Sequence, residues 1–384
     1  MREVSKYKIL TFTRYLGDSF FYPFFSLFLE NQGLVKGKIG FILSISPLIG
    51  IITNPLYATI CKNPNITKKV LSIVSILEAI IIVLLPFCRN FYLISGLTVL
   101  LALFGSCHYG LMDSLLAYFS NNNQINYSSI RLFGSTAYII GTTVGGFIIK
   151  LISFQICFTI ACVLFVLAGV LYFVLQPVSS DTFEKKARVN ILSLFRVKEF
   201  VLFLVLYTLL MGTTNAGDYF FSVYLNSRGL SSQAYGMVYS YYVVIEVLLL
   251  ALFSKFSSKI DNNKLLIIGA FCLCVRFLIN GLYAPIWAVV IASGLRGVTY
   301  AIILHVSFQL VVKILGNNKA TGGIMLITLC QAIFVFIFNN VDGNLIEATS
   351  SYMSYYFLMF GFGVLTFVLA IIRYFTIRPK ELNE

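Results

Sequence analysis

The sequence alternates long apolar runs with short polar segments, and the apolar runs are long enough to cross a bilayer. A membrane-spanning helix needs about 20 mostly apolar residues. By this measure six helices are predicted in the first half of the chain, at 8–30, 37–60, 69–87, 91–119, 130–152 and 154–176. Six more are predicted at 199–225, 233–257, 264–283, 286–313, 320–340 and 351–376. The pattern predicts an all-α membrane protein with twelve transmembrane helices.

The composition supports lipid as the second solvent. Hydrophobic residues make up 59% of the chain and charged residues only 11%, whereas about a quarter of the residues of a soluble domain are charged. The net charge of +13 is compatible with nucleic-acid binding, but Lys and Arg lie at the ends of the apolar runs and form no basic patch interleaved with aromatic residues. We therefore expect no nucleic-acid partner.

The distribution of Lys and Arg predicts the orientation of the chain. With both termini in the cytoplasm, 20 of the 28 basic residues fall on the cytoplasmic side. The exceptions are five on the opposite side (Lys36, Lys38, Arg89, Lys150 and Arg228) and three within spans (Arg14, Arg276 and Arg296). An excess of positive charge marks cytoplasmic loops. We expect a multi-pass protein of the cell membrane with both termini cytoplasmic, and the short loops are typical of a bacterial cell membrane protein.

The two halves of the chain repeat each other. Gly17-Asp18 matches Gly217-Asp218, and after a four-residue gap Gly33-Leu34 matches Gly229-Leu230. Six predicted helices separate the copies, so both have the same orientation, as in the parallel repeats of the major facilitator superfamily. We expect an N-terminal six-helix bundle at 1–176, a cytoplasmic linker at 177–198 and a C-terminal six-helix bundle at 199–384.

Three longer segments carry a family resemblance. They read YPFFSLFL (Tyr22–Leu29), NPLYATICK (Asn54–Lys62) and RLFGSTAY (Arg131–Tyr138). With them the chain resembles the major facilitator superfamily, and more narrowly the branch that holds lactose permease, nucleoside–proton symporters and phenylpropionate permease-like proteins. The resemblance implies the major facilitator fold and secondary transport.

The resemblance also implies a solute site between the fourth and fifth spans. In lactose permease, an acid near the end of span four and an Arg that opens span five bind the sugar, and an aromatic residue stacks on its ring. The matching residues are Asp113, Arg131 and Tyr138, with Phe133-Gly134 following the Arg as in the family. A fork-shaped donor, an acceptor and an aromatic face suit a polyol or a ribose.

Charged side chains inside a membrane are costly and usually functional. Because Asp18 and Asp218 are repeat mates, we expect both to face the cavity and assign them to substrate binding. Arg14 lies four residues before Asp18 on one helix face, so a structural ion pair is the alternative for Asp18.

Three other ionisable residues are expected to lie outside the site, with packing roles for the two histidines. Glu78 lies on the third span, which the resemblance implies is peripheral. His108 points away from Asp113 on its helix, and His305 points away from Arg296. A helix–helix hydrogen bond is the expected role of such a histidine.

The expected proton-coupling residues are Glu246, Arg276 and Arg296. The two arginines keep the spacing of the family, but Arg296 stands where the family has a His, and Thr299 stands where it has the proton-carrying acid. A carboxyl group in a dry cavity holds a proton, and a salt bridge to Arg favours its release. Glu246 is therefore the expected proton carrier, and a permanently ionised partner of Arg276 is the alternative.

Together these features predict a secondary active transporter that moves a small polar solute, with a sugar or nucleoside favoured, by alternating access and proton-coupled symport. The alternative is an efflux antiporter of amphipathic or aromatic compounds, which the aromatic-rich spans allow. An integral membrane enzyme would need clustered metal ligands or a nucleophile–base pair, and the sequence has neither. We expect no catalytic residue, cofactor or metal, and as partners the solute, the coupling proton and the lipid bilayer, with the protein a monomer.

Overall fold

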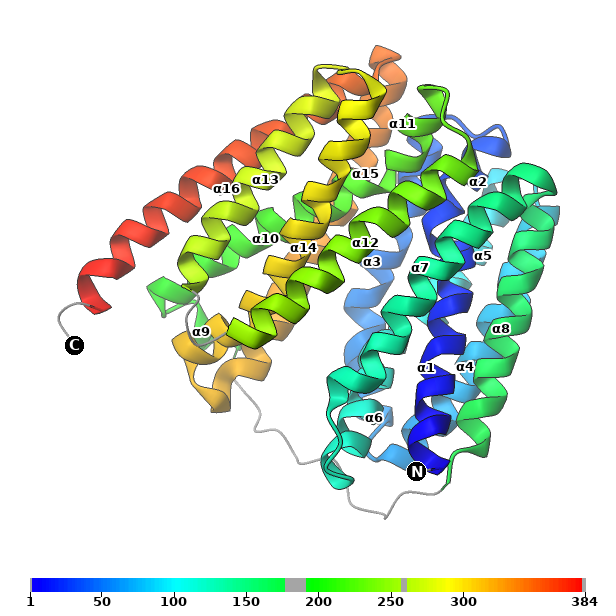
Figure 1. Ribbon diagram of the computed structural model, residues 1–384, viewed down its shortest axis with the longest axis horizontal. Helices are drawn as coiled ribbons and strands as arrows, with labels where there is room; N and C mark the ends of the chain where they lie inside the picture. The colour runs from blue at the N-terminus through cyan, green and yellow to red at the C-terminus, as the bar shows by residue number, and fades with distance from the viewer. Residues whose placement is uncertain (1, 177–190, 257–260, 382–384) are drawn as a thin grey trace. The chain divides into compact units, whose positions relative to one another are not determined.

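A computed structural model describes residues 2–176, 191–256 and 261–381, and every regular element in these ranges is helical (Figure 1). In the first half these elements are α1 (Arg2–Phe21), the 3-10 helix η1 (Tyr22–Phe24), α2 (Phe25–Asn31), α3 (Lys36–Ile60), α4 (Pro64–Leu84), η2 (Leu85–Phe87), α5 (Phe91–Gly105), α6 (His108–Asn122), α7 (Tyr127–Leu151) and α8 (Phe154–Val174). In the second half they are α9 (Ile191–Leu194), α10 (Lys198–Tyr219), α11 (Phe221–Ser227), α12 (Ser232–Phe256), α13 (Asn262–Gly281), α14 (Ile286–Leu315), α15 (Asn317–Thr349) and α16 (Tyr352–Glu381).

The predicted all-α membrane fold is confirmed. Within the described residues, eleven helices are long and apolar enough to cross a membrane. The remaining predicted span, 8–30, corresponds to α1, η1 and α2, and its charged residues keep α1 below that apolar threshold. Arg14 and Asp18 of this helix are nevertheless fully buried.

The chain divides into two compact units, one of residues Met1–Lys185 with Ser222–Ser240, the other of Lys186–Phe221 with Tyr241–Glu384. In the first unit α1 packs against α7 and α8, and α4 packs against α8 (Figure 1). In the second unit α13 packs against α14 and α16. Most of the predicted linker, residues 177–190, lies outside the described residues, so the boundaries 1–176 and 199–384 stay a prediction.

The predicted boundary that differs most from the structure is the end of the eleventh span. The eleventh span was expected to end at 340, but α15 continues for nine more residues to Thr349. Asp342, which lies beyond the predicted end, is inside the helix with no exposed surface, and the helix ends where Ser350 adopts a left-handed conformation with φ of +50°.

The internal repeat extends to backbone conformation. Gly33 and Gly229, which are repeat mates, have φ values of +78° and +86°. The amide of Gly33 donates to the carbonyl of Glu30 at 2.9 Å, and that of Gly229 donates to the carbonyl of Asn226 at 2.9 Å. Glycine ends helices in this left-handed conformation because it has no Cβ. The equivalent helices of the two repeats, α2 and α11, are therefore followed by the same glycine turn.

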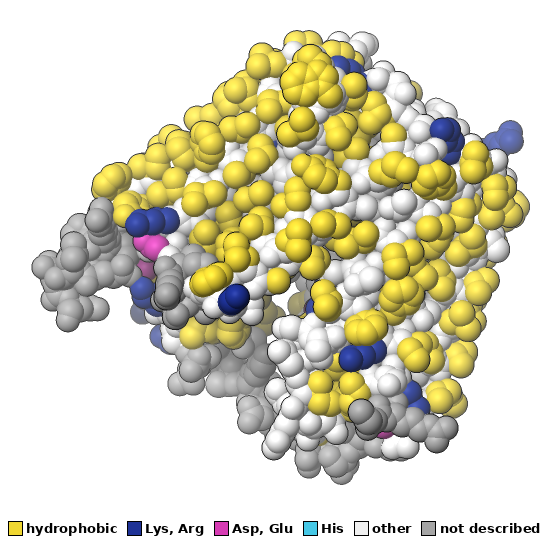
Figure 2. Space-filling view, in the orientation of Figure 1, with side chains coloured by type: hydrophobic (Ala, Val, Ile, Leu, Met, Phe, Trp, Pro, Cys, Tyr) yellow, Lys and Arg dark blue, Asp and Glu magenta, His cyan; other side chains and the backbone are white. Residues whose placement is uncertain are grey.

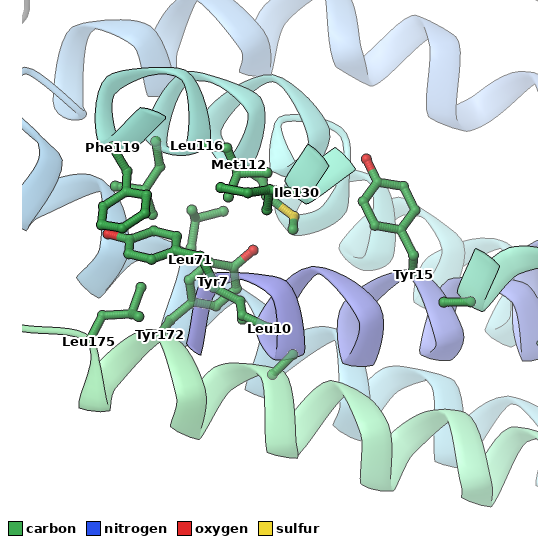
Figure 3. Close-up of a cluster of buried hydrophobic side chains, with 13 residues drawn as sticks. Tyr7, Leu10, Tyr15, Leu71, Met112, Leu116, Phe119, Ile130, Tyr172 and Leu175 are labelled. Atoms are coloured by element: carbon green, nitrogen blue, oxygen red, sulfur yellow. The ribbon is translucent and has the colours of Figure 1, made fainter. Parts of the chain in front are cut away.

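The core at the N-terminal end of α1 is aromatic and aliphatic (Figure 3). The rings of Tyr7 and Phe119 stack with centroids 3.8 Å apart, and Leu10 and Met112 lie in the same buried cluster. Tyr172 of α8 completes it from the other side of α1. This packing fixes α1, α6 and α8 of the first unit to one another.

A close backbone seam joins α7 to the segment Ser232–Ser240 within the first unit. A Cβ atom added to Gly146 would lie 2.5 Å from the carbonyl oxygen of Ser232, and one added to Gly236 would lie 2.3 Å from that of Thr142. The hydroxyl groups of Thr142 and Ser240 are 2.7 Å apart. Only glycine permits this approach.

The outer surface is apolar. Figure 2 shows hydrophobic side chains over most of the face in view, with few Lys and Arg side chains among them. Phe173 is 73% exposed and Trp287, at the first turn of α14, is 66% exposed. A water-facing protein rarely leaves so large an apolar area uncovered, so this surface fits a lipid environment.

Candidate functional site

The predicted pair of Asp113 and Arg131 comes together in the first unit. Asp113 lies on α6 and Arg131 near the start of α7, and Arg131 Nε lies 3.7 Å from Asp113 Oδ1. The Tyr127 hydroxyl also donates to Asp113 Oδ1, at 2.9 Å. The side chains of Arg131 and Asp113 are 36% and 41% exposed, so both are open to a solute.

Aromatic rings flank this pair. The guanidinium carbon of Arg131 lies 4.3 Å from the centroid of the Tyr15 ring. A Cβ atom on Gly134 would lie 2.8 Å from the Tyr15 ring and 3.0 Å from Arg131, so the Phe-Gly pair of the family makes room for this stack. Tyr138 follows, with its ring 6.5 Å from that of Tyr15. Sequence reasoning missed Tyr15, whose signal was an aromatic residue beside Arg14 in a charged helix.

Asp18 does not join this pair but belongs to a second group of charges. Arg14 Nη2 lies 3.1 Å from Asp18 Oδ1, and Arg14 Nη1 lies 3.0 Å from Glu78 Oε2. His108 Nδ1 lies 3.5 Å from the same oxygen of Glu78. All four side chains are fully buried. The structure therefore shows the ion pair that was the alternative for Asp18, and Glu78 of the third span belongs to the same cluster. His108 also lies 3.1 Å from the Tyr172 hydroxyl of α8, which fits the structural role expected of it.

The second unit brings together all four of its predicted site residues. Asp218 of α10 accepts a bond of 2.5 Å from Arg276 of α13 and one of 2.9 Å from Arg296 of α14. Arg296 also donates to Glu246 of α12 at 3.2 Å. The Arg296 guanidinium lies between the rings of Tyr242 and Tyr300, 4.4 Å from each. Two acids and two guanidinium groups thus form one continuous network.

Two further polar residues of the second unit were missed. Asn339 and Asp342 of α15 have no exposed surface, and their side-chain oxygens have no hydrogen-bond partner within the described residues. The sequence signal was an acid only two residues beyond the predicted end of the eleventh span. His305 packs against the Phe253 ring at 5.2 Å, which fits the expected packing role.

The geometry supports binding and charge rearrangement. One pair in the first unit is open, with donors, acceptors and aromatic faces that suit an oxygen-rich solute. The other charges lie within helices, fully buried in the first unit and with partly exposed acids in the second, and ionisable groups inside such helices usually mark ion or proton pathways. Within the described residues, no three His, Cys, Asp or Glu side chains lie close enough together to hold a metal ion.

Comparison with known proteins agrees with this architecture. The model of the MFS_1 like family matches residues 4–357. A probable 3-phenylpropionic acid transporter of Escherichia coli (strain K12) is 25% identical over 286 residues, which cover 73% of this chain and 75% of that protein. The maltose permease of Geobacillus stearothermophilus is 22% identical over 289 residues, covering 75% and 73%.

Solved structures share the fold. The crystal structure of a mutant of the nucleoside transporter NupG matches with a TM-score of 0.85 over 96% of this chain and 99% of that one, at 14% identity. These relatives are transporters and not enzymes, as expected. The chain belongs to the MFS_1 like family and is a multi-pass membrane transporter of the major facilitator superfamily.

Proposed function

We propose that the protein transports a small polar solute, a sugar or a nucleoside, by alternating access and proton-coupled symport. The observation that supports this most is the open pair of Asp113 and Arg131 between Tyr127 and Tyr15. The carboxylate accepts from hydroxyl groups, the guanidinium donates two parallel bonds, and an aromatic ring covers a sugar or base face. The similarity to a maltose permease and to a nucleoside transporter points to the same solute class.

The proposed coupling step uses the network of the second unit. Glu246 forms a salt bridge with Arg296. In the proposed switch, this salt bridge belongs to the state in which Glu246 is deprotonated. On protonation Glu246 loses its attraction to Arg296, and Arg296 remains held by Asp218. We place the protein in the cell membrane as a monomer with both termini in the cytoplasm.

A second candidate is efflux of amphipathic or aromatic compounds. Three tyrosine rings cluster beside Arg131: the ring centroid of Tyr109 lies 5.5 Å from that of Tyr15, and the ring centroid of Tyr138 lies 6.5 Å from it. Such a wall also fits an aromatic compound, and one relative is a probable 3-phenylpropionic acid transporter. The solute panel must therefore include this class.

The test is uptake by the full chain in proteoliposomes under an imposed pH gradient, with labelled sugars, nucleosides and phenylpropionate as probes. Asp113→Asn is expected to lower uptake of the transported probe by about tenfold or more, because a charged hydrogen bond is lost. Tyr92→Phe, at a side chain 79% exposed and distant in sequence from the site, is the control. If no sugar or nucleoside is taken up and an aromatic probe is exported, the proposal is overturned in favour of efflux.

The coupling assignment has its own measurement. Glu246→Gln is expected to abolish pH-driven accumulation and to leave solute exchange across the membrane intact, because a neutral amide neither gains nor loses a proton. Glu30→Gln, which removes the acid paired with Lys36, is the control for a carboxylate at the end of a helix, in α2. Driven accumulation that survives in Glu246→Gln would refute this role.

A further inference from the structure

The charges of the buried cluster formed by Arg14, Asp18 and Glu78 do not balance. Arg14 contributes one positive charge, and the carboxylates of Asp18 and Glu78 contribute two negative charges. All three side chains and His108 are fully buried. An uncompensated buried charge is strongly disfavoured, and such a group takes up a proton instead. The cluster is neutral when one proton binds to it.

The network of the second unit shows the contrast. Asp218 and Glu246 carry two negative charges, and Arg276 and Arg296 carry two positive charges. This network is neutral with both acids ionised, so charge balance places no proton there.

No nearby group supplies the missing positive charge to the cluster of the first unit. The titratable side chains that act on it electrostatically are Tyr15, Tyr22, Tyr57, Cys107, Tyr109, Tyr138, Tyr172 and Arg131. All but Arg131 are neutral or become negative on ionisation. Arg131 has its own acid, Asp113.

The contacts of His108 offer a place for this proton. His108 Nδ1 faces Glu78 Oε2 at 3.5 Å, and His108 Nε2 lies 3.1 Å from the Tyr172 hydroxyl. Glu78 Oε2 also lies 3.0 Å from Arg14 Nη1, and neither this oxygen nor His108 Nδ1 forms a hydrogen bond within the described residues. A protonated Glu78 donates to Nδ1 of a neutral His108, and Nε2–H then donates to Tyr172. This arrangement satisfies both ring nitrogens and puts no second cation beside Arg14.

The backbone is built around this carboxyl group. A Cβ atom on Gly105 would lie 2.3 Å from Glu78 Oε1, so any larger residue there would displace the acid. On the other side of the cluster, the Arg14 guanidinium lies 3.9 Å from the centroid of the Phe165 ring, and a Cβ atom on Gly17 would lie 2.7 Å from that ring. The two glycines leave the space that the acid and the arginine stack occupy.

We propose that Glu78 and His108 form a proton-binding site, occupied in this conformation and separate from Glu246. The proton is carried on Glu78 Oε2 and shared with His108 Nδ1, and its release to water leaves Glu78 as a carboxylate beside Arg14. That this proton takes part in transport rests on the proposed function, whereas its presence rests on the charges and contacts of the cluster alone.

The site is tested by infrared spectroscopy on the full chain in proteoliposomes at neutral pH. The spectrum of each variant is compared with that of the original protein. Glu78→Gln is expected to remove a carbonyl-stretch band of a protonated carboxylic acid, while Glu246→Gln leaves the bands of protonated acids unchanged. Asp342→Asn serves as the reference for a second buried acid. A spectrum of Glu78→Gln with the same band area as the original protein overturns the site.

A second variant keeps the test decisive if Glu78→Gln does not fold. His108→Gln is expected to shift the Glu78 band, because the acceptor of its proton changes, and a band at the same frequency overturns the sharing with His108.

In transport, Glu78→Gln is expected to reduce pH-driven accumulation of the probe to the level without a gradient. Unchanged accumulation overturns the transport role and leaves the site intact. If the original protein transports no probe, the proposed function fails and the spectra still decide the site.

Discussion

Two acids of the second unit, Asp218 and Asp342, differ in what surrounds them. Asp218 receives bonds from Arg276 and Arg296, whereas both carboxyl oxygens of Asp342 lack a hydrogen-bond partner within the described residues. An ionised acid between two guanidinium groups balances their charge and so stabilises them. A buried acid without such a partner is stable only when it is neutral. The same side chain thus has opposite charge requirements at the two positions.

This difference predicts opposite effects of the same substitution. Asp218→Asn leaves Arg276 and Arg296 without a full counter-charge, so we expect a loss of about 3–5 kcal/mol in the free energy of unfolding. Asp342→Asn replaces a neutral acid by a neutral amide of the same shape, so we expect little change. Thermal unfolding in detergent compares the two. Equal destabilisation by both substitutions would show that Asp342 is ionised.

The sequence was informative about which residues are charged and less so about which of them meet. Asp113 and Arg131 were predictable as a pair because the family spacing specifies them. Glu78 and His108 lie on different helices, and their contact depends on how α4 and α6 pack, which no local pattern encodes.

At the scale of elements, run length predicted the helices well because the bilayer fixes how many apolar residues a span requires. Interruptions were harder to predict. The fourth span is divided into α5 and α6 around Ser106 and Cys107, and α15 extends beyond its last apolar run. Both depend on tertiary packing, which a local pattern of apolar residues does not encode.

The seam between α7 and the start of α12 leads to a prediction about one methyl group. Gly236→Ala places a Cβ atom against the backbone of Thr142, so the helices must separate and the hydrogen bond between Thr142 and Ser240 is lost. Gly96→Ala is the matched control, because nothing lies within 4 Å of its added Cβ.

The measurement is cross-linking between cysteines introduced at Lys150 and Gln233. In the original protein, Lys150 Nζ donates a hydrogen bond of 2.9 Å to Gln233 Oε1. We expect Gly236→Ala to reduce the cross-linked fraction and Gly96→Ala to leave it unchanged. Equal yields in all three proteins would mean that the seam adapts without opening.

For the whole molecule, the positive charge of the loops predicts the side on which each end lies. We expect green fluorescent protein fused to the C-terminus to fluoresce and alkaline phosphatase fused there to be inactive, because both termini are predicted to be cytoplasmic. Alkaline phosphatase fused after Arg89, on the predicted outer side, is the positive control and is expected to be active. An active C-terminal phosphatase fusion would reverse the topology.

The exposed Trp287 gives the protein a built-in optical probe. It is the sole tryptophan of the chain, so all indole fluorescence reports on one turn of α14. Indole rings favour the boundary between lipid and water. Quenching by lipids brominated at successive depths therefore measures how far that turn lies from the bilayer centre, and it does so in the native sequence without a label.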